Sequence, residues 1–424
     1  MGIIVILIMF GLIALGVPIT FSLGVASLVY FTVNDVSLLT FAQKFAMSVD
    51  SFALLALPFF ILAGNLMNQG GVTKRLFDFC DSLVGFVQGG LSYVTVVSSV
   101  IFSAISGSAL ANAAGLGTLQ IRAMKDKGYD KGFSTSLVTT AAVLGPVIPP
   151  SILMIIYGVT AGVSVQRMFI AGILPGLIYA LMCCVLCKYY GKKLNLPKGK
   201  RESLRQIGGR FLEAIWALLA PVIILAGILS GVFTPTESGA IASVYVIIVA
   251  VFIYRELTFA DVMQCLLDTA KTTGTILLIA ATASLLGFCM TFARVPMQFA
   301  AYLTGAFDSP MSILFILMLL YLFLGTIMEG SAVILTTVPI FIPLCQKVGI
   351  DLVYFGVFVS ILMSIATVTP PVGTVMFVIC RNNGLTVGEF TRNMLPWFGL
   401  MFVFCALLVL FPEIITAMPK LFLK

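Results

Sequence analysis

Polar and helix-breaking residues that could bind a cation stand at two matched places in an otherwise apolar sequence. Ser103 and Ser106 precede the segment 143–150, in which three prolines fall within five residues. Gly325 precedes the segment 367–373, which contains the run Thr-Pro-Pro. Prolines remove N–H donors and clash with the preceding turn, so both segments must interrupt a helix. At membrane depth such backbone survives only where it lines a protein-enclosed cavity.

The two interruptions predict two Na⁺ sites, because unwound carbonyls and hydroxyl side chains supply several oxygen ligands without burying a full charge. A polar hairpin tip laid against each broken helix would complete the coordination. The first predicted site consists of Ser103 and Ser106 with the backbone near Gly145 and Ile148. The second consists of Gly325 and Thr369 with the backbone near Ala366 and Val372. Half-helix N-termini at the same cavity would favour an anionic substrate.

Few ionisable residues fall within apolar sequence, and each is a functional candidate. Glu329 is the strongest, because it lies at the predicted tip of the second hairpin. Arg294 lies at the outer end of a span, where it could bind a substrate carboxylate or extend to the lipid headgroups. The sequence leaves both roles open. Glu237 follows Thr-Pro-Thr and is interpreted as a helix cap.

The interruptions belong to a duplicated unit, because residues 128–175 recur as residues 349–396 at a constant spacing of 221. The matching pairs are Gly128/Gly349, Asp130/Asp351, Pro149/Pro370, Pro150/Pro371, Phe169/Phe390, Leu174/Leu395 and Pro175/Pro396. Upstream, residues 107–109 and 330–332 both read Gly-Ser-Ala, which we align at a spacing of 223. Matched breaks in two halves are typical of secondary transporters with a central substrate site.

Composition restricts the class of protein. Of the 424 residues, 60% are apolar and 10% are charged, so apolar runs of about 18 or more residues fill most of the sequence. We therefore predict an all-α polytopic membrane protein in contact with membrane lipid. The sequence contains no histidine, which excludes Ser-His-Asp triads and H-E-x-x-H zinc sites, so we predict no enzyme. We assign the net charge of +7 to membrane orientation and expect no nucleic-acid partner.

Basic residues set the predicted orientation. Eight of them lie within residues 188–210 against a single acid, so this loop is predicted to be cytoplasmic. We then count one membrane crossing for each apolar segment, walking along the chain in both directions from this loop. The count places 18 basic residues on the cytoplasmic side and six outside, the six being Lys44, Arg167, Arg294, Lys347, Lys420 and Lys424. This walk puts the N-terminus in the cytoplasm and the C-terminus outside, and it makes the two repeats inverted. Because Met1 leads directly into an apolar run, we expect no cleaved signal peptide.

The predicted organisation has three parts. Residues 1–187 form the first inverted repeat, with an arm at 38–48, a re-entrant hairpin at about 98–122 and a broken helix at about 131–162. Residues 188–235 form the basic loop and a linking span. Residues 236–424 form the second repeat, with an arm at 258–269, a hairpin at about 325–347 and a broken helix at about 352–383.

The hairpin runs, the Gly-Pro-x-x-Pro-Pro and Thr-Pro-Pro breaks, the two-copy layout and the polar arms together resemble the large membrane subunit of the tripartite ATP-independent periplasmic (TRAP) transporters. The resemblance covers essentially the whole chain and is greatest to the sialic-acid type. It implies Na⁺-coupled import of an organic acid across the bacterial inner membrane by an elevator movement of the hairpins and broken helices against a scaffold. It also implies two partners, a small four-helix membrane subunit and a soluble periplasmic binding protein.

Carried over to this sequence, the resemblance implies Na⁺ near Ser103, Ser106 and Gly145 and near Gly325 and Thr369. It implies substrate contacts at Ser108, Arg294 and Glu329. Many family members carry an aspartate at the position of Glu329, so this chain keeps the charge on a longer side chain. Two alternatives stay open, a C4-dicarboxylate or other carboxylate transporter of the same family and a stand-alone Na⁺- or H⁺-coupled carboxylate carrier.

Overall fold

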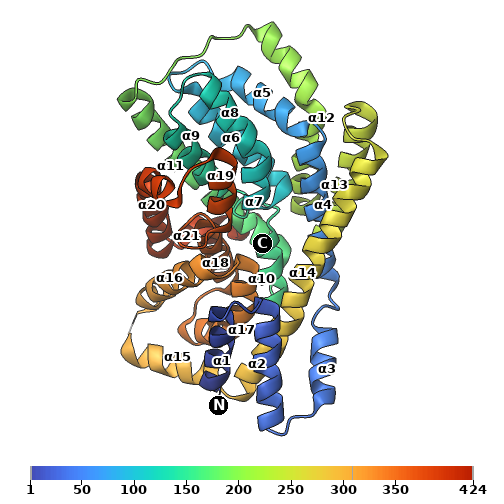
Figure 1. The fold of residues 1–424 in the computed structure, drawn as a ribbon, viewed down its shortest axis with the longest axis vertical. Helices are drawn as coiled ribbons and strands as arrows, with labels where there is room; N and C mark the ends of the chain where they lie inside the picture. The colour runs from blue at the N-terminus through green and yellow to red at the C-terminus, as the bar shows by residue number, and fades with distance from the viewer. Residues whose placement is uncertain (1, 308, 423–424) are drawn as a thin grey trace.

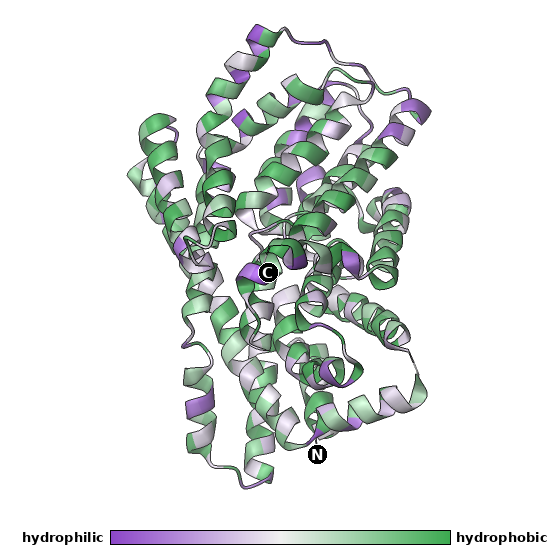
Figure 2. Ribbon diagram, turned by 180° about the vertical axis from the view of Figure 1, so that it is seen from behind, coloured by the Kyte–Doolittle hydropathy of each residue, from purple (hydrophilic) through white to green (hydrophobic). Residues whose placement is uncertain are grey.

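The computed structural model describes residues 2–307 and 309–422, which form helices joined by turns and loops, with one isolated bridge between Gln88 and Lys198. Among the described helical segments, eight are long and apolar enough to cross a membrane, so the protein is a multi-pass membrane protein. Figure 2 shows apolar residues over most of the helices and hydrophilic residues at the end that carries the basic loop.

The helices of the first half lead up to the basic loop. They are α1 (Gly2–Ala14), α2 (Ile19–Val33), α3 (Leu38–Met47), η1 (Phe52–Leu55), α4 (Ala56–Gln69), α5 (Val72–Val84), α6 (Gly90–Ser106), α7 (Ala109–Ala111), the π-helix η2 (Asn112–Leu116), α8 (Gly117–Asp126), α9 (Lys131–Ala142), α10 (Ile152–Ala161) and α11 (Val165–Lys193).

The helices of the second half follow the basic loop. They are α12 (Leu204–Leu229), α13 (Pro235–Ile248), the π-helix η3 (Val249–Ile253), α14 (Phe259–Phe292), α15 (Val295–Ala306), α16 (Pro310–Ile327), α17 (Gly330–Val348), α18 (Leu352–Ala366), α19 (Thr374–Asn383), α20 (Val387–Leu410) and α21 (Glu413–Phe422).

Several of the repeated residue types are helix caps. Asp130 accepts a hydrogen bond from the backbone N–H of Phe133 at 2.8 Å and begins α9, and Asp351 accepts one from Tyr354 at 2.7 Å and begins α18. Gly128 and Gly349, two residues earlier, have φ of 78° and 77°. Only glycine adopts this left-handed conformation without steric cost, so the same turn recurs in both halves.

The spacing of 221 extends over most of the chain. Helices α3 and α14 begin at residues 38 and 259, α7 and α17 at 109 and 330, and α9 and α18 at 131 and 352. Each pair differs by 221. The predicted shift to 223 at the Gly-Ser-Ala runs is therefore wrong. The residue equivalent to Ser108 is Glu329, and both cap the helix that follows.

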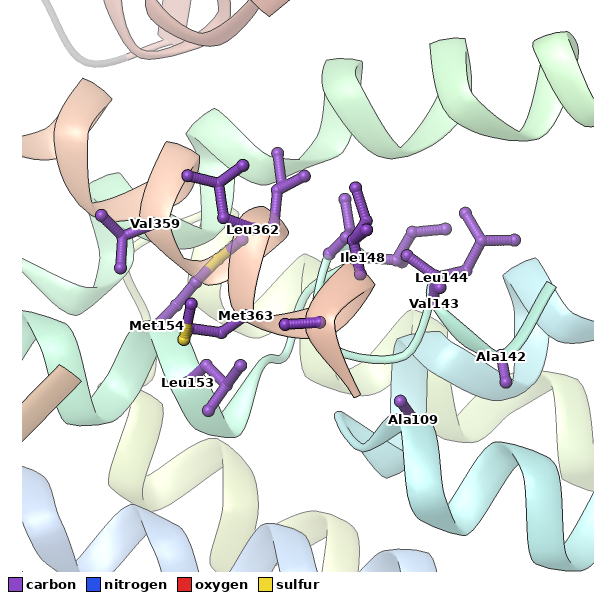
Figure 3. Close-up of a cluster of buried hydrophobic side chains, with 14 of the residues drawn as sticks. Ala109, Ala142, Val143, Leu144, Ile148, Leu153, Met154, Val359, Leu362 and Met363 are labelled. Carbon is purple, nitrogen blue, oxygen red and sulfur yellow. The ribbon is translucent and has the colours of Figure 1, made fainter. Parts of the chain in front are cut away.

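The two halves are inverted about an axis near the middle of the molecule. Hairpin 1 (α6 to α8, residues 90–126) enters from the end that carries the basic loop, and hairpin 2 (α16 and α17, residues 310–348) enters from the opposite end (Figure 1). The hydroxyl of Ser364 donates to the carbonyl of Val143 at 2.7 Å. These residues are also 221 apart, so equivalent positions touch where the broken helices cross. Figure 3 shows the apolar core there, with Leu153 and Met154 beside Met363.

Helix α14 runs along most of the length of the molecule (Figure 1). It has 34 residues and includes the whole segment that the sequence predicted as a separate second arm. That prediction is wrong, because no proline follows the cap, and the isolated glycines Gly274 and Gly287 are tolerated within a helix. The first arm is a separate helix, α3, whose residues are all at least partly exposed.

The N-terminal apolar run is two helices and not one span. Gly16, with φ of 85°, and Pro18 break the run, and α1 folds back on α2. Gly2 lies beside Val295 and the ring of Tyr30 lies 6.4 Å from that of Phe292, at the end of the molecule opposite the basic loop (Figure 1). The predicted placement of the N-terminus on the side of the basic loop is therefore wrong, because the walk counted one crossing where two helices form a hairpin.

Two predicted boundaries differ from the structure. Hairpin 2 begins at Pro310 and not near residue 325, because its first limb is as apolar as a full span and sequence alone does not distinguish the two. The linking span is α12, which pairs with α13 as α1 pairs with α2, so the second repeat begins within α12. Helix α21 contacts α11 and α18, and Met1 and Lys424 lie outside the described residues.

Candidate functional site

A cavity of about 480 Å³ lies where both hairpin tips and both helix breaks meet α4 and α14. The first half contributes Ile61, residues 107–110, Pro146, Ile152 and Leu153 to its wall. The second half contributes Thr272, Thr275, Ile276, Ile279, residues 329–331, Thr367, Thr374 and Val375. The structure thus brings together two of the predicted substrate contacts, Ser108 and Glu329.

Tip 1 (residues 106–109) is held against the first break (residues 143–151). Gly107 has φ of 62°, and its carbonyl accepts a hydrogen bond from the N–H of Ile152 at 3.4 Å. A Cβ atom added to Gly145 would lie 2.5 Å from the carbonyl carbon of Ser108. Glycine at 145 therefore permits the backbones of tip and break to touch. The hydroxyl of Ser108 accepts from Ala111 N–H at 3.3 Å and caps the next helix.

Tip 2 (residues 327–330) carries the only carboxylate on the described wall of the cavity. One oxygen of Glu329 accepts from the N–H of Ser331 at 2.9 Å and of Ala332 at 3.3 Å, and it also accepts from the Ser331 hydroxyl. Gly330 lies between Leu153 of α10 and Met363 of α18. Glu329 therefore stabilises the N-terminus of α17. Its other oxygen accepts no hydrogen bond within the described residues, so it can accept one from a ligand hydroxyl.

Four helical segments begin at this cavity. Ala109, Ile152, Gly330 and Thr374 line it, and they are the first residues of the helical run 109–126, of α10, of α17 and of α19. Each N-terminus presents the positive end of a helix dipole, and part of its N–H groups already donate within the protein, as Ile152 does to Gly107 and Val375 to Thr367. No lysine or arginine is found among the described lining residues. The backbone of the four N-termini thus places partial positive charge at the cavity beside the carboxylate of Glu329, and helix N-termini are sites that suit an anionic ligand.

The first predicted Na⁺ ligands are enclosed. Ser103 and Ser106 are 0% and 2% exposed and lie one turn apart on α6. Ser103 accepts from the side-chain amide of Asn112 at 3.1 Å, whereas the Ser106 hydroxyl is buried with no hydrogen-bond partner among the described residues. Within the same described part of the chain, the carbonyls of Gly145 and Ile148 accept no hydrogen bond. Unpaired buried oxygens are costly unless something binds them, so this oxygen set fits a cation.

The second predicted set is more open. Gly325 contacts Ala366 so closely that an added Cβ would collide with the alanine side chain. The Ala366 carbonyl accepts from Thr369 N–H at 3.1 Å, and the Thr369 hydroxyl donates to Ile365 at 2.9 Å. Val372 is 44% exposed and donates its N–H to Thr326 at 3.2 Å. These residues are adjacent, but their polar atoms are largely used within the protein.

The structure does not bring Arg294 to the cavity. It occupies a left-handed conformation with φ of 54° at the start of α15, next to the residues that contact Gly2. Sequence reasoning instead missed Thr272 and Thr275 of α14 and Thr367 and Thr374 of the second break. The run Lys-Thr-Thr-Gly-Thr at 271–275, inside a long apolar helix, was a signal that could have indicated the first two.

A scaffold residue also contacts hairpin 1. The side-chain amide of Asn68 on α4 donates to the Ala111 carbonyl at 3.4 Å, and Asn68 fills the space beside Gly115. This contact lies at the π-helix 112–116, where the i to i+5 pattern alters which carbonyls are free. Nearby, Asn65 donates to Thr269 of α14 at 3.1 Å, which ties α4 to α14.

Residues 6–414 match the family of the tripartite ATP-independent periplasmic transporter, DctM component. The sialic acid TRAP transporter permease SiaT of Haemophilus influenzae is 38% identical over 96% of this chain, which spans 66% of that relative's length. The sialic acid large permease SiaM of Vibrio cholerae is 37% identical over 97% of both chains. The C4-dicarboxylate large permease DctM of Pseudomonas aeruginosa is also 37% identical, over 94% of this chain and 92% of its own.

Two solved structures of membrane transporters share the fold. The YdaH transporter of Alcanivorax borkumensis aligns with a TM-score of 0.62 at 15% identity, over 88% of this chain and 87% of its own. MtrF of Neisseria gonorrhoeae aligns with a TM-score of 0.64 at 13% identity, over 90% of this chain and 85% of its own. At these identities the likeness concerns the arrangement of helices and not the substrate.

Proposed function

Because the chain belongs to the DctM component family of the tripartite ATP-independent periplasmic transporters and is a large permease of that type, we propose that it imports an organic acid across the bacterial inner membrane, coupled to Na⁺. The proposal includes two partners, a small membrane subunit and a periplasmic binding protein that delivers the substrate. The relatives are permeases and not enzymes, which agrees with a role in transport.

The convergence of four helix N-termini on one cavity is the main observation in favour of an anionic substrate. A carboxylate at this point would receive backbone N–H groups at the positive ends of helix dipoles. The only charged lining residue among those described, Glu329, is already neutralised in part by the N–H groups of its own helix. Binding of a monocarboxylate at these N-termini does not require a lysine or arginine side chain in the cavity wall.

The remaining chemistry of the cavity supports a polyhydroxylated acid such as sialic acid. Six hydroxyl side chains line it, namely Ser108, Thr272, Thr275, Ser331, Thr367 and Thr374. Hydroxyls both donate and accept, so they match a sugar acid better than a dicarboxylate, whose second charge calls for a cation. The relatives named for sialic acid, for 2,3-diketo-L-gulonate and for C4-dicarboxylates are 35–38% identical to this chain, so overall identity does not separate these substrates.

Na⁺ coupling is supported by the contact between tip 1 and the first break. Ser106 would bind the ion with the carbonyls of Gly145 and Ile148, and the next residues of the tip line the substrate cavity. An ion that fixes tip 1 against the break also fixes Ser108 at the cavity wall. Ion and substrate then favour the same arrangement, which is the requirement for coupling.

The arrangement of the two parts supports an elevator movement. Hairpins 1 and 2 with α9, α10, α18 and α19 carry the cavity, and α4 and α14 border it as the scaffold. We propose that the former group moves as a unit along α14. Contacts such as that between Asn68 and hairpin 1 would then break and re-form in each cycle.

Uptake by the assembled complex tests this function. The chain is reconstituted with its small subunit in liposomes, with the binding protein outside and an inward Na⁺ gradient, and radiolabelled sialic acid and succinate are supplied separately. We expect sialic acid uptake that requires both Na⁺ and the binding protein. Uptake of succinate but not of sialic acid would support a transporter of this family with a dicarboxylate as its substrate. Uptake without the binding protein would favour a stand-alone carrier. Accumulation that does not depend on the Na⁺ gradient would contradict Na⁺ coupling.

A further inference from the structure

A second cavity of about 430 Å³ borders the same scaffold helix farther toward the end opposite the basic loop. We call it the Lys44 cleft, because Lys44 of α3 lines it together with the hydroxyl residues Ser48, Thr160, Ser284 and Thr291 and the ring of Phe288. Lys44 is the only charged residue among the described lining residues.

Three helices pass from the substrate cavity to the Lys44 cleft. Helix α10 lines the cavity with Ile152 and the cleft with Thr160, and α17 lines the cavity with Ser331 and the cleft with Leu335. Helix α14 lines the cavity with residues 272–279 and the cleft with residues 280–291. The nearest lining residues of the two spaces are six residues apart on α10, four apart on α17 and consecutive on α14, so the two spaces are neighbours.

Two faces of one helix, α14, line the two spaces. Residues 272, 275, 276 and 279 face the cavity, and residues 280, 284, 287, 288 and 291 face the cleft. Each set lies on one face of the helix, and at about 100° per residue the second face is rotated by about 120° from the first. Residues 284, 287, 288 and 291 lie 12 residues after the first set, which corresponds to about 18 Å along the helix axis.

Lys44 is placed to receive an anion in the cleft. Its ammonium lies 5.6 Å from the centroid of the Phe288 ring, on the wall of the cleft. It forms no ion pair with a carboxylate of the described residues. The lining hydroxyls add donors beside it, as the hydroxyls do in the substrate cavity.

We propose that the Lys44 cleft is a second organic-anion site, in which the ammonium of Lys44 binds the carboxylate of the substrate on the side of the molecule opposite the basic loop. This inference rests on the proposed function. When the tips move along α14 and partly around it to face residues 284–291, the substrate that they hold comes beside Lys44. The positive charge that backbone supplies at the inner position is thus supplemented by a side chain at the outer one.

The test measures occupancy of the cleft directly. In the full complex, Ser284→Cys provides a thiol in the cleft, and the wild-type chain with its native cysteines is the blank. A membrane-impermeant thiol reagent is applied with increasing sialic acid, or with succinate if uptake selects that acid. We expect the acid to protect this thiol, and K44Q to raise the half-protecting concentration about tenfold, since a charge-assisted pair to a carboxylate is lost.

Three variants separate the charge of Lys44 from other effects. K44R should restore protection, because it keeps the charge. K347Q is the matched control, since Lys347 donates to Thr304 at 3.0 Å and is not among the residues that line the cleft. S48D leaves Lys44 in place but adds a competing carboxylate one turn away on the cleft wall, so it should also raise the half-protecting concentration.

The outcomes distinguish this inference from the proposed function. If the Ser284→Cys complex imports no organic acid although the wild-type complex does, the same protection series is run on Thr291→Cys, which lines the same cleft. A wild-type complex that imports no organic acid overturns the proposed function and this inference with it. Uptake with unchanged protection in both K44Q and S48D overturns the Lys44 site alone.

Discussion

The two hairpins have equivalent backbones and different side chains. Hairpin 1 buries eight polar side chains, Ser92, Thr95, Ser98, Ser99, Ser103, Ser106, Asn112 and Gln120. The residues 221 positions later in hairpin 2 are Ile313, Ile316, Leu319, Leu320, Leu324, Ile327, Val333 and Phe341, all apolar. Within hairpin 1, the Gln120 amide donates to Thr95, Ser98 and Ser99 at 3.1–3.3 Å. Duplication thus preserved the fold of the limb while the side chains on it diverged.

The two breaks differ in the same direction. Residues 143–151 are all buried, whereas in the second break Pro371 and Val372 are exposed and Thr367, Thr369 and Pro370 are half-buried. The glycine that permits close packing is on the break in the first half, at Gly145, and on the hairpin in the second, at Gly325. The comparison shows that a repeated backbone can supply two equivalent helix breaks with different surroundings. Of the two, the first is buried and carries oxygens that have no hydrogen-bond partner within the described residues.

The largest expected effect on uptake comes from adding a side chain where the first break touches tip 1. Gly145→Ala would place a Cβ 2.5–2.7 Å from the backbone of Ser108 and Ala109, which cannot move as a flexible side chain could. Overpacking of this kind costs about 1–3 kcal/mol, so we expect Na⁺-driven uptake to fall by roughly 5- to 150-fold. The matched control is Ala366→Gly at the equivalent position, which should change uptake by about twofold or less. Equal losses of uptake in both variants would contradict the expectation that the contact in the first half matters more than the one in the second.

A smaller effect is expected when the unpaired hydroxyl is removed. Ser106→Ala takes away one oxygen from the enclosed set but breaks no hydrogen bond within the described residues. Bonds to charged groups are worth about 1.5–3 kcal/mol, so the Na⁺ concentration for half-maximal uptake should rise about tenfold or more with little change in thermal stability. Ser136→Ala removes another buried, unpaired hydroxyl on α9 and serves as the control. Unchanged Na⁺ dependence of uptake in Ser106→Ala would contradict a Na⁺ site at tip 1.

The smallest effect concerns the two caps. Ser108→Ala and Glu329→Ala each remove an N-cap, which costs about 1 kcal/mol of stability. Glu329 accepts from two N–H groups and adds a negative charge at a helix N-terminus, so its replacement should lower the thermal midpoint of the purified complex more. Glu329→Gln should fall between the two. A larger shift in Ser108→Ala would show that tip 1 depends on its cap more than tip 2 does.

Much of the site could be predicted because its residues break local rules. The prolines of both breaks, the serines of hairpin 1 and Glu329 are conspicuous in apolar sequence, and Ser108 and Glu329 do line one cavity. The threonines of α14 were missed because hydroxyls within a helix are usually explained by their own backbone, as Thr272 donates to Asp268 at 2.9 Å. Arg294 was an intramembrane charge by sequence, but its side of the molecule depends on how α14 and α15 meet.

The sequence by itself determined that this protein is a helical membrane protein with two copies of one unit, because hydropathy and proline act over a few residues. It also determined where the helices begin, since Asp130, Asp351 and similar caps bond to N–H groups three residues away. Only the tertiary structure decided the direction of α1, the full length of hairpin 2 and which oxygens are left unpaired at tip 1. Those properties depend on contacts between residues far apart in the chain, such as Gly2 with Val295 and Gly145 with Ser108, which no local pattern encodes.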